Sequence, residues 1–195
     1  MSIRKWFARK PSHQPVPAGV GSSGTAPRLA AEDMLTNQDS EDKSDLETTP
    51  PTPIGQGRLI SHLSELGYKF STDEDGDVVG IWDGNAFWFM FLGSSNGFFQ
   101  IRSRWHRGVG SLDKSLALQT CNDWNRDKLW PKTFLREDPE SQGYVVYAEN
   151  TFDFSDGATP KQFSYSIELA LKSTLHFYQH LESLIAPDNE ETDQD

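Results

Sequence analysis

Two residue patterns in this chain have spacings that support metal binding in other proteins, and each lacks an essential partner. His176 and His180 lie four residues apart, a spacing that can place two imidazoles on one side of a zinc ion. However, Phe177 stands where a zinc protease has its glutamate, and no third ligand is evident. The aspartates of residues 73–77 alternate like the first ligands of a calcium loop, but the glycine and the glutamate that such a loop requires are absent. We therefore expect solvated or partly packed histidines, an acidic hairpin turn and no metal.

The patterns for a nucleophile and for a cofactor are equally incomplete. A cysteine nucleophile needs a nearby cation or base to lower its pKa, whereas Lys114 and Lys128 are each seven residues away from Cys121. The G-x-G-x-x-G run at residues 19–24 lies in a linker, without the strand and the helix that a dinucleotide-binding fingerprint requires. A single cysteine also cannot form an internal disulfide, which favours a reducing compartment, the cytoplasm. The sequence thus favours a buried structural thiol in a protein that is not an enzyme and holds no cofactor.

One basic cluster lies in the region that we expect to fold, formed by Arg102, Arg104, His106 and Arg107. It could hold an acidic peptide, a phosphate or the acidic tail of the same chain, or it could be a solvated strand edge. The net charge of −11 disfavours nucleic acid, because such a body repels the phosphate backbone. No apolar run approaches the length of a membrane span.

Composition divides the chain into three parts. Residues 1–54 form an arm with a basic, aromatic start and a linker rich in proline, serine, threonine and acidic residues, which we expect to be disordered. Residues 55–187 have the size of a single-core domain, and residues 188–195 form an acidic disordered tail. The threonines of residues 48–53 are either accessible to kinases or part of a passive linker. The basic start either touches a membrane surface or has no function of its own.

Hydrophobic periodicity and turn signals predict an α+β domain. Helical spacing from Leu59 to Leu66, with Gly67 as the stop, predicts the first helix. The other expected elements are three strands between Tyr68 and Trp105, a helix that begins after Ser111 or Asp113 and ends before Pro131, strands at Thr133–Arg136 and 143–148, and a long helix from Pro160 to Pro187 capped by Thr159. Their apolar stripes comprise Leu112, Leu116, Cys121 and Trp124 in the second helix, and Phe163, Ile167, Ala170, Tyr178, Leu181 and Ile185 in the third. The order αβββαββα describes an antiparallel five-stranded sheet with three helices.

The turns predict which strand residues share a face. Two-residue turns at 83–84 and at 95–96 or 96–97 would place opposite residues on one side of the sheet. One face would then be an apolar core, formed by Val79, Ile81, Trp88, Met90, Leu92, Phe99, Ile101 and Trp105. The other would combine aromatics with two arginines, as protein-binding surfaces do, and would contain Trp82, Phe87, Phe89, Phe91, Phe98, Arg102 and Arg104. In the alternative the second helix packs on this aromatic face, and a three-residue turn would exchange the two faces.

The region from about residue 58 to 186 resembles the bacterial YbjN family of proposed sensory transduction regulators. The resemblance lies in Gly67-Tyr68 leading into the acidic turn 75–77, and in the stretch 118–131 (LQTCNDWNRDKLWP), with its two asparagines followed by Trp-Pro. It implies an α+β domain structurally similar to type III secretion chaperones, which binds other proteins or modulates regulation. It implies no catalytic residues.

These observations together predict a non-enzymatic protein-binding module, chaperone-like or regulatory, that uses the aromatic and arginine-bearing sheet face. Its partner would be a protein or peptide of unknown identity, or a second copy of the chain in a homodimer. The alternative function is that of a homodimeric regulator that senses a small molecule bound between the sheet and the helices.

Overall fold

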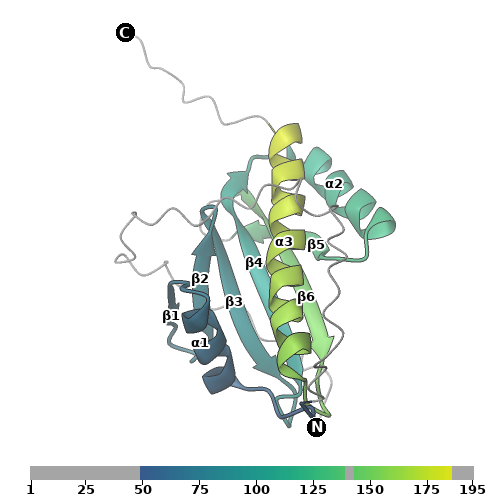
Figure 1. Cartoon of the computed structure of the whole chain (residues 1–195). Coiled ribbons are helices and arrows are strands. Elements are labelled where there is room, and N and C mark those ends of the chain that lie inside the picture. Colours follow the sequence, from purple (N-terminus) through teal and green to yellow (C-terminus); the bar gives the residue numbers. More distant parts are fainter. Residues whose placement is uncertain (1–48, 139–142, 186–195) are drawn as a thin grey trace, which may run out of the picture.

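The computed structural model describes residues 49–138 and 143–185, and these form one sheet with three helices (Figure 1). The elements are α1 (Gln56–Glu65), β1 (Phe70–Thr72), β2 (Val78–Trp82), β3 (Asn85–Leu92), β4 (Phe98–Val109), α2 (Lys114–Asp127), β5 (Lys132–Asp138), β6 (Gly143–Asp153) and α3 (Pro160–Leu184). The three helices and the antiparallel sheet confirm the α+β class.

The sheet has six strands in the order β1-β2-β3-β4-β6-β5, so the prediction of five strands in the order αβββαββα is wrong. The missed strand is β1, which contains only three residues. It pairs with β2 across the acidic turn, where the Asp73 carboxylate accepts a hydrogen bond from the amide of Asp77 at 2.8 Å. The Asp75-Gly76 turn signal therefore separates two strands, whereas the prediction did not count the short first one.

The helices begin and end where local chemistry favours it. The Thr159 hydroxyl accepts from the Gln162 amide while the Gln162 side chain accepts from the Thr159 amide, a capping box with Pro160 at the first position of α3. Gly67, with φ of 70°, follows α1 as predicted. The stripe predicted for the second helix is partly wrong, because Leu112 precedes α2 and is 98% exposed, and Leu116 is 39% exposed. The buried residues of α2 are Ala117, Thr120, Cys121 and Trp124.

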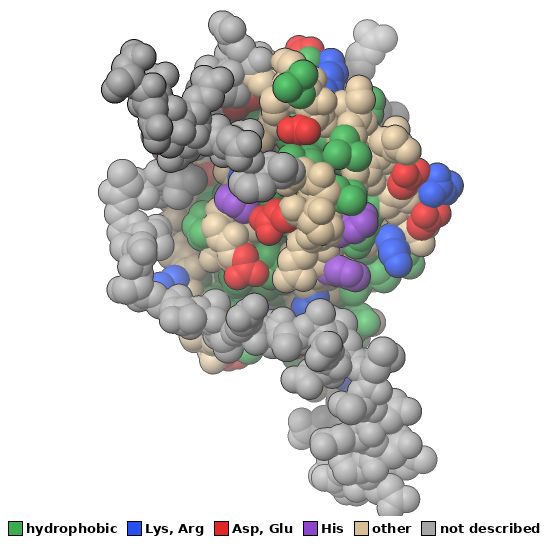
Figure 2. Space-filling model, turned by 90° about the horizontal axis from the view of Figure 1, so that it is seen from above, with side chains coloured by type: hydrophobic (Ala, Val, Ile, Leu, Met, Phe, Trp, Pro, Cys, Tyr) green, Lys and Arg blue, Asp and Glu red, His purple; other side chains and the backbone are tan. Residues whose placement is uncertain are grey.

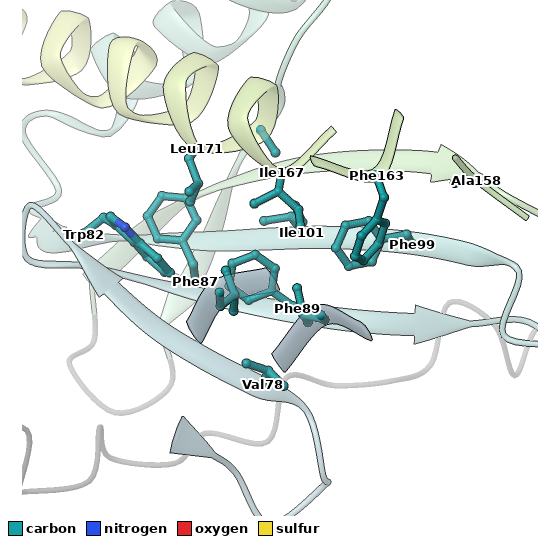
Figure 3. Packing of buried hydrophobic residues seen from close by; sticks show 13 residues of the cluster. Val78, Trp82, Phe87, Phe89, Phe99, Ile101, Ala158, Phe163, Ile167 and Leu171 are labelled. Atoms are coloured by element: carbon teal, nitrogen blue, oxygen red, sulfur yellow. The ribbon is translucent and has the colours of Figure 1, made fainter. Parts of the chain in front are cut away.

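All three helices pack against one face of the sheet, which we call the inner face (Figure 1). One cluster lies beneath α1 and the first half of α3, where Phe87, Phe89 and Phe99 meet Phe163 and residues around it (Figure 3). A second cluster lies beneath α2 and the second half of α3, around Trp105 and Tyr178. The apolar stripe predicted for α3 is buried along its whole length, which confirms that prediction.

The connection between β3 and β4 determines which residues form this inner face. The two-residue turn at 83–84 is confirmed, because Trp82 pairs with Asn85. Leu92 pairs with Phe98, however, so that five residues connect β3 to β4 instead of two. Since side chains alternate between faces with a period of two, this odd number exchanges the predicted faces of β2 and β3 relative to β4.

Candidate interaction surface

The seven residues predicted to form one binding face lie on both faces of the sheet. The four from β2 and β3 lie under the helices: Trp82 is 7% exposed, Phe87 is fully buried, Phe89 is 1% exposed, and Phe91 packs against the same cluster. Phe98, Arg102 and Arg104 lie on the opposite face, which we call the outer face. The single aromatic face is therefore corrected. Its aromatic part is core, packed under α1 and α3 and not under α2 as the alternative had it.

The outer face instead carries residues that were predicted to be core. Its apolar half lies on β2, β3 and the start of β4. It consists of Phe98, which was predicted on the binding face, and of five residues predicted to be core: Val79, Ile81, Trp88, Met90 and Leu92. Val79 lies opposite Trp88, and Leu92 lies opposite Phe98. Ile81, Trp88, Leu92 and Phe98 are each half-buried. Val79 and Met90 are 9% and 7% exposed and are therefore buried. Within the described residues no helix packs on this face, so the apolar surface in the middle of the sheet is offered by the four half-buried side chains.

The charged half of the outer face is arranged around one carboxylate, that of Glu149. Arg102 Nε lies 2.6 Å from Glu149 Oε1, and Lys132 Nζ lies 3.2 Å from Glu149 Oε2. Glu149 is only 8% exposed, whereas Lys132 is 68% exposed. Two cations thus share one buried carboxylate, and this part of the face carries a surplus positive charge within an acidic protein.

Two further interactions extend this charged half. Arg104 Nη2 lies 3.4 Å from Asp138 Oδ2, at the edge formed by β5. The rings of Phe134 and Tyr147 stack with their centroids 5.5 Å apart, and Lys132 Nζ lies 5.1 Å from the centre of the Phe134 ring. The outer face thus combines aromatic rings with cations on both β4 and β5, a combination that favours binding of peptide carboxylates and apolar side chains.

The predicted basic cluster divides at a β-bulge between Arg104 and Gly108. Within this irregular stretch, His106 and Arg107 contact the end of α3. His106 Nδ1 lies 3.6 Å from Glu182 Oε1, and Arg107 donates a hydrogen bond to the carbonyl of Ile185 at 3.3 Å. The cluster therefore does not form one site, and only its first two arginines belong to the outer face.

The sequence patterns that suggested metal binding serve packing in the structure. His176 and His180 both pack near Trp124, with ring centroids 5.5 and 5.8 Å from the centroid of its ring. Figure 2, which shows the end of the molecule where α2 and the end of α3 lie, has histidine side chains among hydrophobic and acidic ones. Among the described residues no group of three or more potential ligands gathers as a metal site would need. The G-x-G-x-x-G run, the threonines up to residue 48 and the acidic tail lie outside the described residues.

Cys121 lies in the second core cluster and is 1% exposed. Burial raises the pKa of its thiol to about 11, so the nucleophilic thiolate is scarce at neutral pH. The side chain packs against its neighbours and takes no part in the outer face.

Comparison with known proteins places this geometry in a family. The family model of YbjN, "Putative bacterial sensory transduction regulator", matches residues 56–183. The chain belongs to the YbjN family. A solved structure of the same fold is the crystal structure of YbjN, a putative transcription regulator from E. coli, at a TM-score of 0.59 and 14% identity, covering 71% of this chain and all of that chain. No match is found among curated proteins.

In this YbjN chain, the stretch that carried the resemblance connects α2 to an edge of the sheet. Asn125 Nδ2 donates to the carbonyl of Thr133, and the amide of Thr133 donates to Asn125 Oδ1, both at 2.8 Å. Trp124 Nε1 donates to the carbonyl of Trp130 at 3.2 Å, next to a cis bond to Pro131. Asn125 thus satisfies both backbone groups of a residue on the edge strand β5, as a neighbouring strand would.

Sequence reasoning missed Trp88, Lys132 and Glu149 as residues of the outer face of this YbjN domain. The sequence places a glycine at each end of the β3–β4 connection, Gly93 and Gly97, and this pair could have indicated a longer loop. The structure agrees, since Gly93 adopts a φ of 86°, a conformation that favours glycine. Lys132 and Glu149 are directly paired across β5 and β6.

No helix of the described part is long and apolar enough to cross a membrane.

Proposed function

We propose that this YbjN-family chain is a non-enzymatic regulator that binds another protein through the outer face of its sheet. The face would bind a partner segment that carries both apolar and acidic side chains. The observation that carries the proposal is the juxtaposition of the apolar half around Trp88 with the cations around Glu149. Tryptophan and arginine are the residue types over-represented where binding energy concentrates.

The family supports the regulatory part of this proposal. Its description names a sensory transduction regulator, and the E. coli relative is described as a putative transcription regulator. Such a regulator, like the chaperone-like alternative, acts by contact with a partner and needs no catalytic group. The unpaired, buried Cys121 suits a reducing compartment, so we place the action of the protein in the cytoplasm.

The space between sheet and helices, where the alternative function would put a small ligand, is filled by aromatic side chains. The Phe99 ring lies 5.1 Å from Phe163 and 5.2 Å from Phe91, centroid to centroid. Trp82 lies 5.3 Å from Phe87 in the same layer. This packing favours the outer face over the interlayer space as the site of recognition.

The proposal is tested with full-length tagged protein and two matched pairs of variants. Trp88→Asp removes the central apolar side chain of the outer face, and Tyr165→Asp makes the same change at an exposed position of α3 (64%). Lys132→Glu reverses the most exposed cation of the face, and Lys161→Glu reverses one on α3. We expect a partner captured from the native lysate by the unchanged chain to be lost with both outer-face variants and kept with both controls.

Circular dichroism and thermal melting establish that each variant is folded. A partner that stays bound to the folded Trp88→Asp and Lys132→Glu proteins would contradict the proposal. Light scattering on the same samples measures the molar mass and so tests whether the protein is a homodimer. A dimer that dissociates on Trp88→Asp, with no other protein captured, would make a second copy the occupant of the face.

A further inference from the structure

The arm that precedes the described residues contains one segment whose composition matches the outer face. In residues 11–48, three large aliphatic side chains fall within seven positions only at 29–35, in the sequence LAAEDML. Glu32 and Asp33 lie between them, so the segment offers both apolar groups and carboxylates. Its chemistry is that of the partner segment proposed above.

The structure fixes the point from which this arm departs. Thr52 and Ala158 form a β-bridge, with N···O distances of 3.1 and 2.9 Å. Arg58 Nη1 donates to the carbonyl of Thr52 at 3.0 Å and to that of Ala158 at 2.9 Å. Gly157 lies so close that a Cβ there would stand 2.7 Å from the Thr52 oxygen. The chain just before α1 is therefore clasped against the segment that leads into α3.

This clasp lies at the end of the sheet where the apolar half of the outer face begins. The amide of Phe154 donates to the carbonyl of Gly97 at 2.8 Å, and the amide of Gly157 donates to the carbonyl of Phe154 at the same distance. Gly97 immediately precedes Phe98, which belongs to the outer face. The arm thus leaves the domain a few residues from one end of the surface.

The length of the intervening chain allows the segment to reach the face. Thr49 follows Leu35 by fourteen positions, and a flexible chain of that length has a root-mean-square span of about 20 Å. The eight residues of β3 extend over roughly 26 Å, so the middle of the strand is within reach of the segment. A tether of this length also raises the local concentration of the segment to the millimolar range.

Charge selects this segment over the other ends of the chain. Arg102 and Lys132 share the single carboxylate of Glu149, so an additional carboxylate from Glu32 or Asp33 would be attracted. The first ten residues carry four cations and no carboxylate, and they would be repelled by the same surplus. The acidic tail 188–195 has no aliphatic or aromatic side chain for the apolar half.

We infer that residues 29–35 dock on the outer face of their own chain and compete there with the protein partner. This inference rests on the proposed function and adds its regulation: the unliganded protein would be self-blocked, and the partner would displace the arm. Because the segment is tethered, even weak contacts keep the face occupied until a partner of higher affinity arrives.

The test is photo-crosslinking in the full-length chain and needs no partner. The photoreactive amino acid p-benzoylphenylalanine replaces Trp88, and the protein is irradiated as an equal mixture of 14N- and 15N-labelled chains. We expect crosslinked peptides that join position 88 to residues 29–35 with both halves carrying the same label. The same probe at Tyr165 on α3 is the control and should give no such product.

Two other outcomes would overturn the inference. Peptides of mixed label would show a second copy on the face, and a product without residues 29–35 would show that the segment does not dock. If the probe at position 88 prevents folding, the exposed Lys132 is replaced by the probe instead.

A variant with Leu35→Asp and Glu32→Lys should lower the crosslink yield several-fold and raise partner capture. Partner binding that fails while the intramolecular crosslink persists would contradict the proposed function alone.

Discussion

Asn125 shows how one side chain can connect a helix to a sheet in this fold. It lies near the end of α2, yet the nitrogen and the oxygen of its side-chain amide both form hydrogen bonds with the backbone of Thr133 on the edge strand β5. The Thr133 hydroxyl in turn donates to the carbonyl of Cys121 at 3.1 Å. The edge strand is therefore held to α2 by polar groups as well as by packing.

Replacing Asn125 by alanine should lower the free energy of unfolding by about 1–2 kcal/mol, because two backbone groups lose their partner. Asn122→Ala is the matched control. It lies one turn earlier on α2, is exposed, and gains the same helix propensity on replacement. Urea unfolding of both variants measures the difference. Equal stability of the two variants would show that the bonds of Asn125 contribute nothing.

Cys121 gives a stability prediction that depends on pH. Burial raises its pKa to about 11 in the folded protein, above the value of about 8.5 for an unperturbed thiol. A raised folded pKa favours the folded state fully at pH below about 8.5, and this contribution disappears as pH rises to about 11. Unfolding of the unchanged chain and of Cys121→Ala, measured from pH 7 to 11, should show the stability advantage of the cysteine shrinking by roughly 3 kcal/mol. An advantage that stays constant across this range would mean that the Cys121 thiol has the same pKa in the folded and in the unfolded state.

At the scale of elements, strand β3 determines what the two faces of the sheet do. Its residues alternate between a layer packed under α1 and α3 and the outer face. Phe87 is fully buried on the inner side, and its neighbour Trp88 is half-buried on the outer side. Two adjacent aromatic residues therefore have different roles, and substitution can separate them.

Phe87→Ala should cost about 3–5 kcal/mol of unfolding free energy, the usual loss for a buried phenylalanine. Trp88→Ala should cost less, about 1–2 kcal/mol, because the indole is only partly removed from water. Thermal and urea unfolding of the two single variants checks the order. A larger loss for Trp88 would reverse the assignment of the faces and remove the basis of the outer surface.

The sequence was sufficient to predict most elements of this domain but not its faces. Helical spacing, the Thr159-Pro160 start and the Asp83-Gly84 turn gave α1, α3 and the β2–β3 hairpin correctly. The three-residue β1 was missed because so short a run shows no alternation. The faces depend on whether the β3–β4 connection has an odd or even number of residues, and several small residues there permit either. Of the aromatic residues predicted to share a face with Arg102 and Arg104, only Phe98 does so, and the other four lie on the inner face.

At the scale of the whole molecule, the chain ahead of α1 is fixed to the turn ahead of α3. Gly157 has a φ of 87°, a conformation that other residues rarely adopt, and a Cβ there would stand 2.7 Å from the carbonyl oxygen of Thr52. The bridge between Thr52 and Ala158 and the bonds from Arg58 all lie around this contact. The position of Gly157 therefore controls both the start of α3 and the point where the arm leaves the domain.

Gly157→Ala should destabilise the protein by about 1–3 kcal/mol, through backbone strain and the forced separation of the two segments. Gly57→Ala is the control, because that glycine lies in α1 and a Cβ added there would meet no neighbouring atom within 4 Å. Alanine at position 57 should stabilise the protein by up to about 1 kcal/mol.

Limited proteolysis adds a second measurement: cleavage around Thr52 should become faster only in the Gly157 variant. Because the clasp positions the arm at the end of the outer face, the same variant should also weaken the crosslink between position 88 and residues 29–35. If Gly157→Ala melts like the unchanged protein and is cleaved no faster, the arm is held by other contacts, and the route from the clasp to the outer face fails as the explanation of self-blocking.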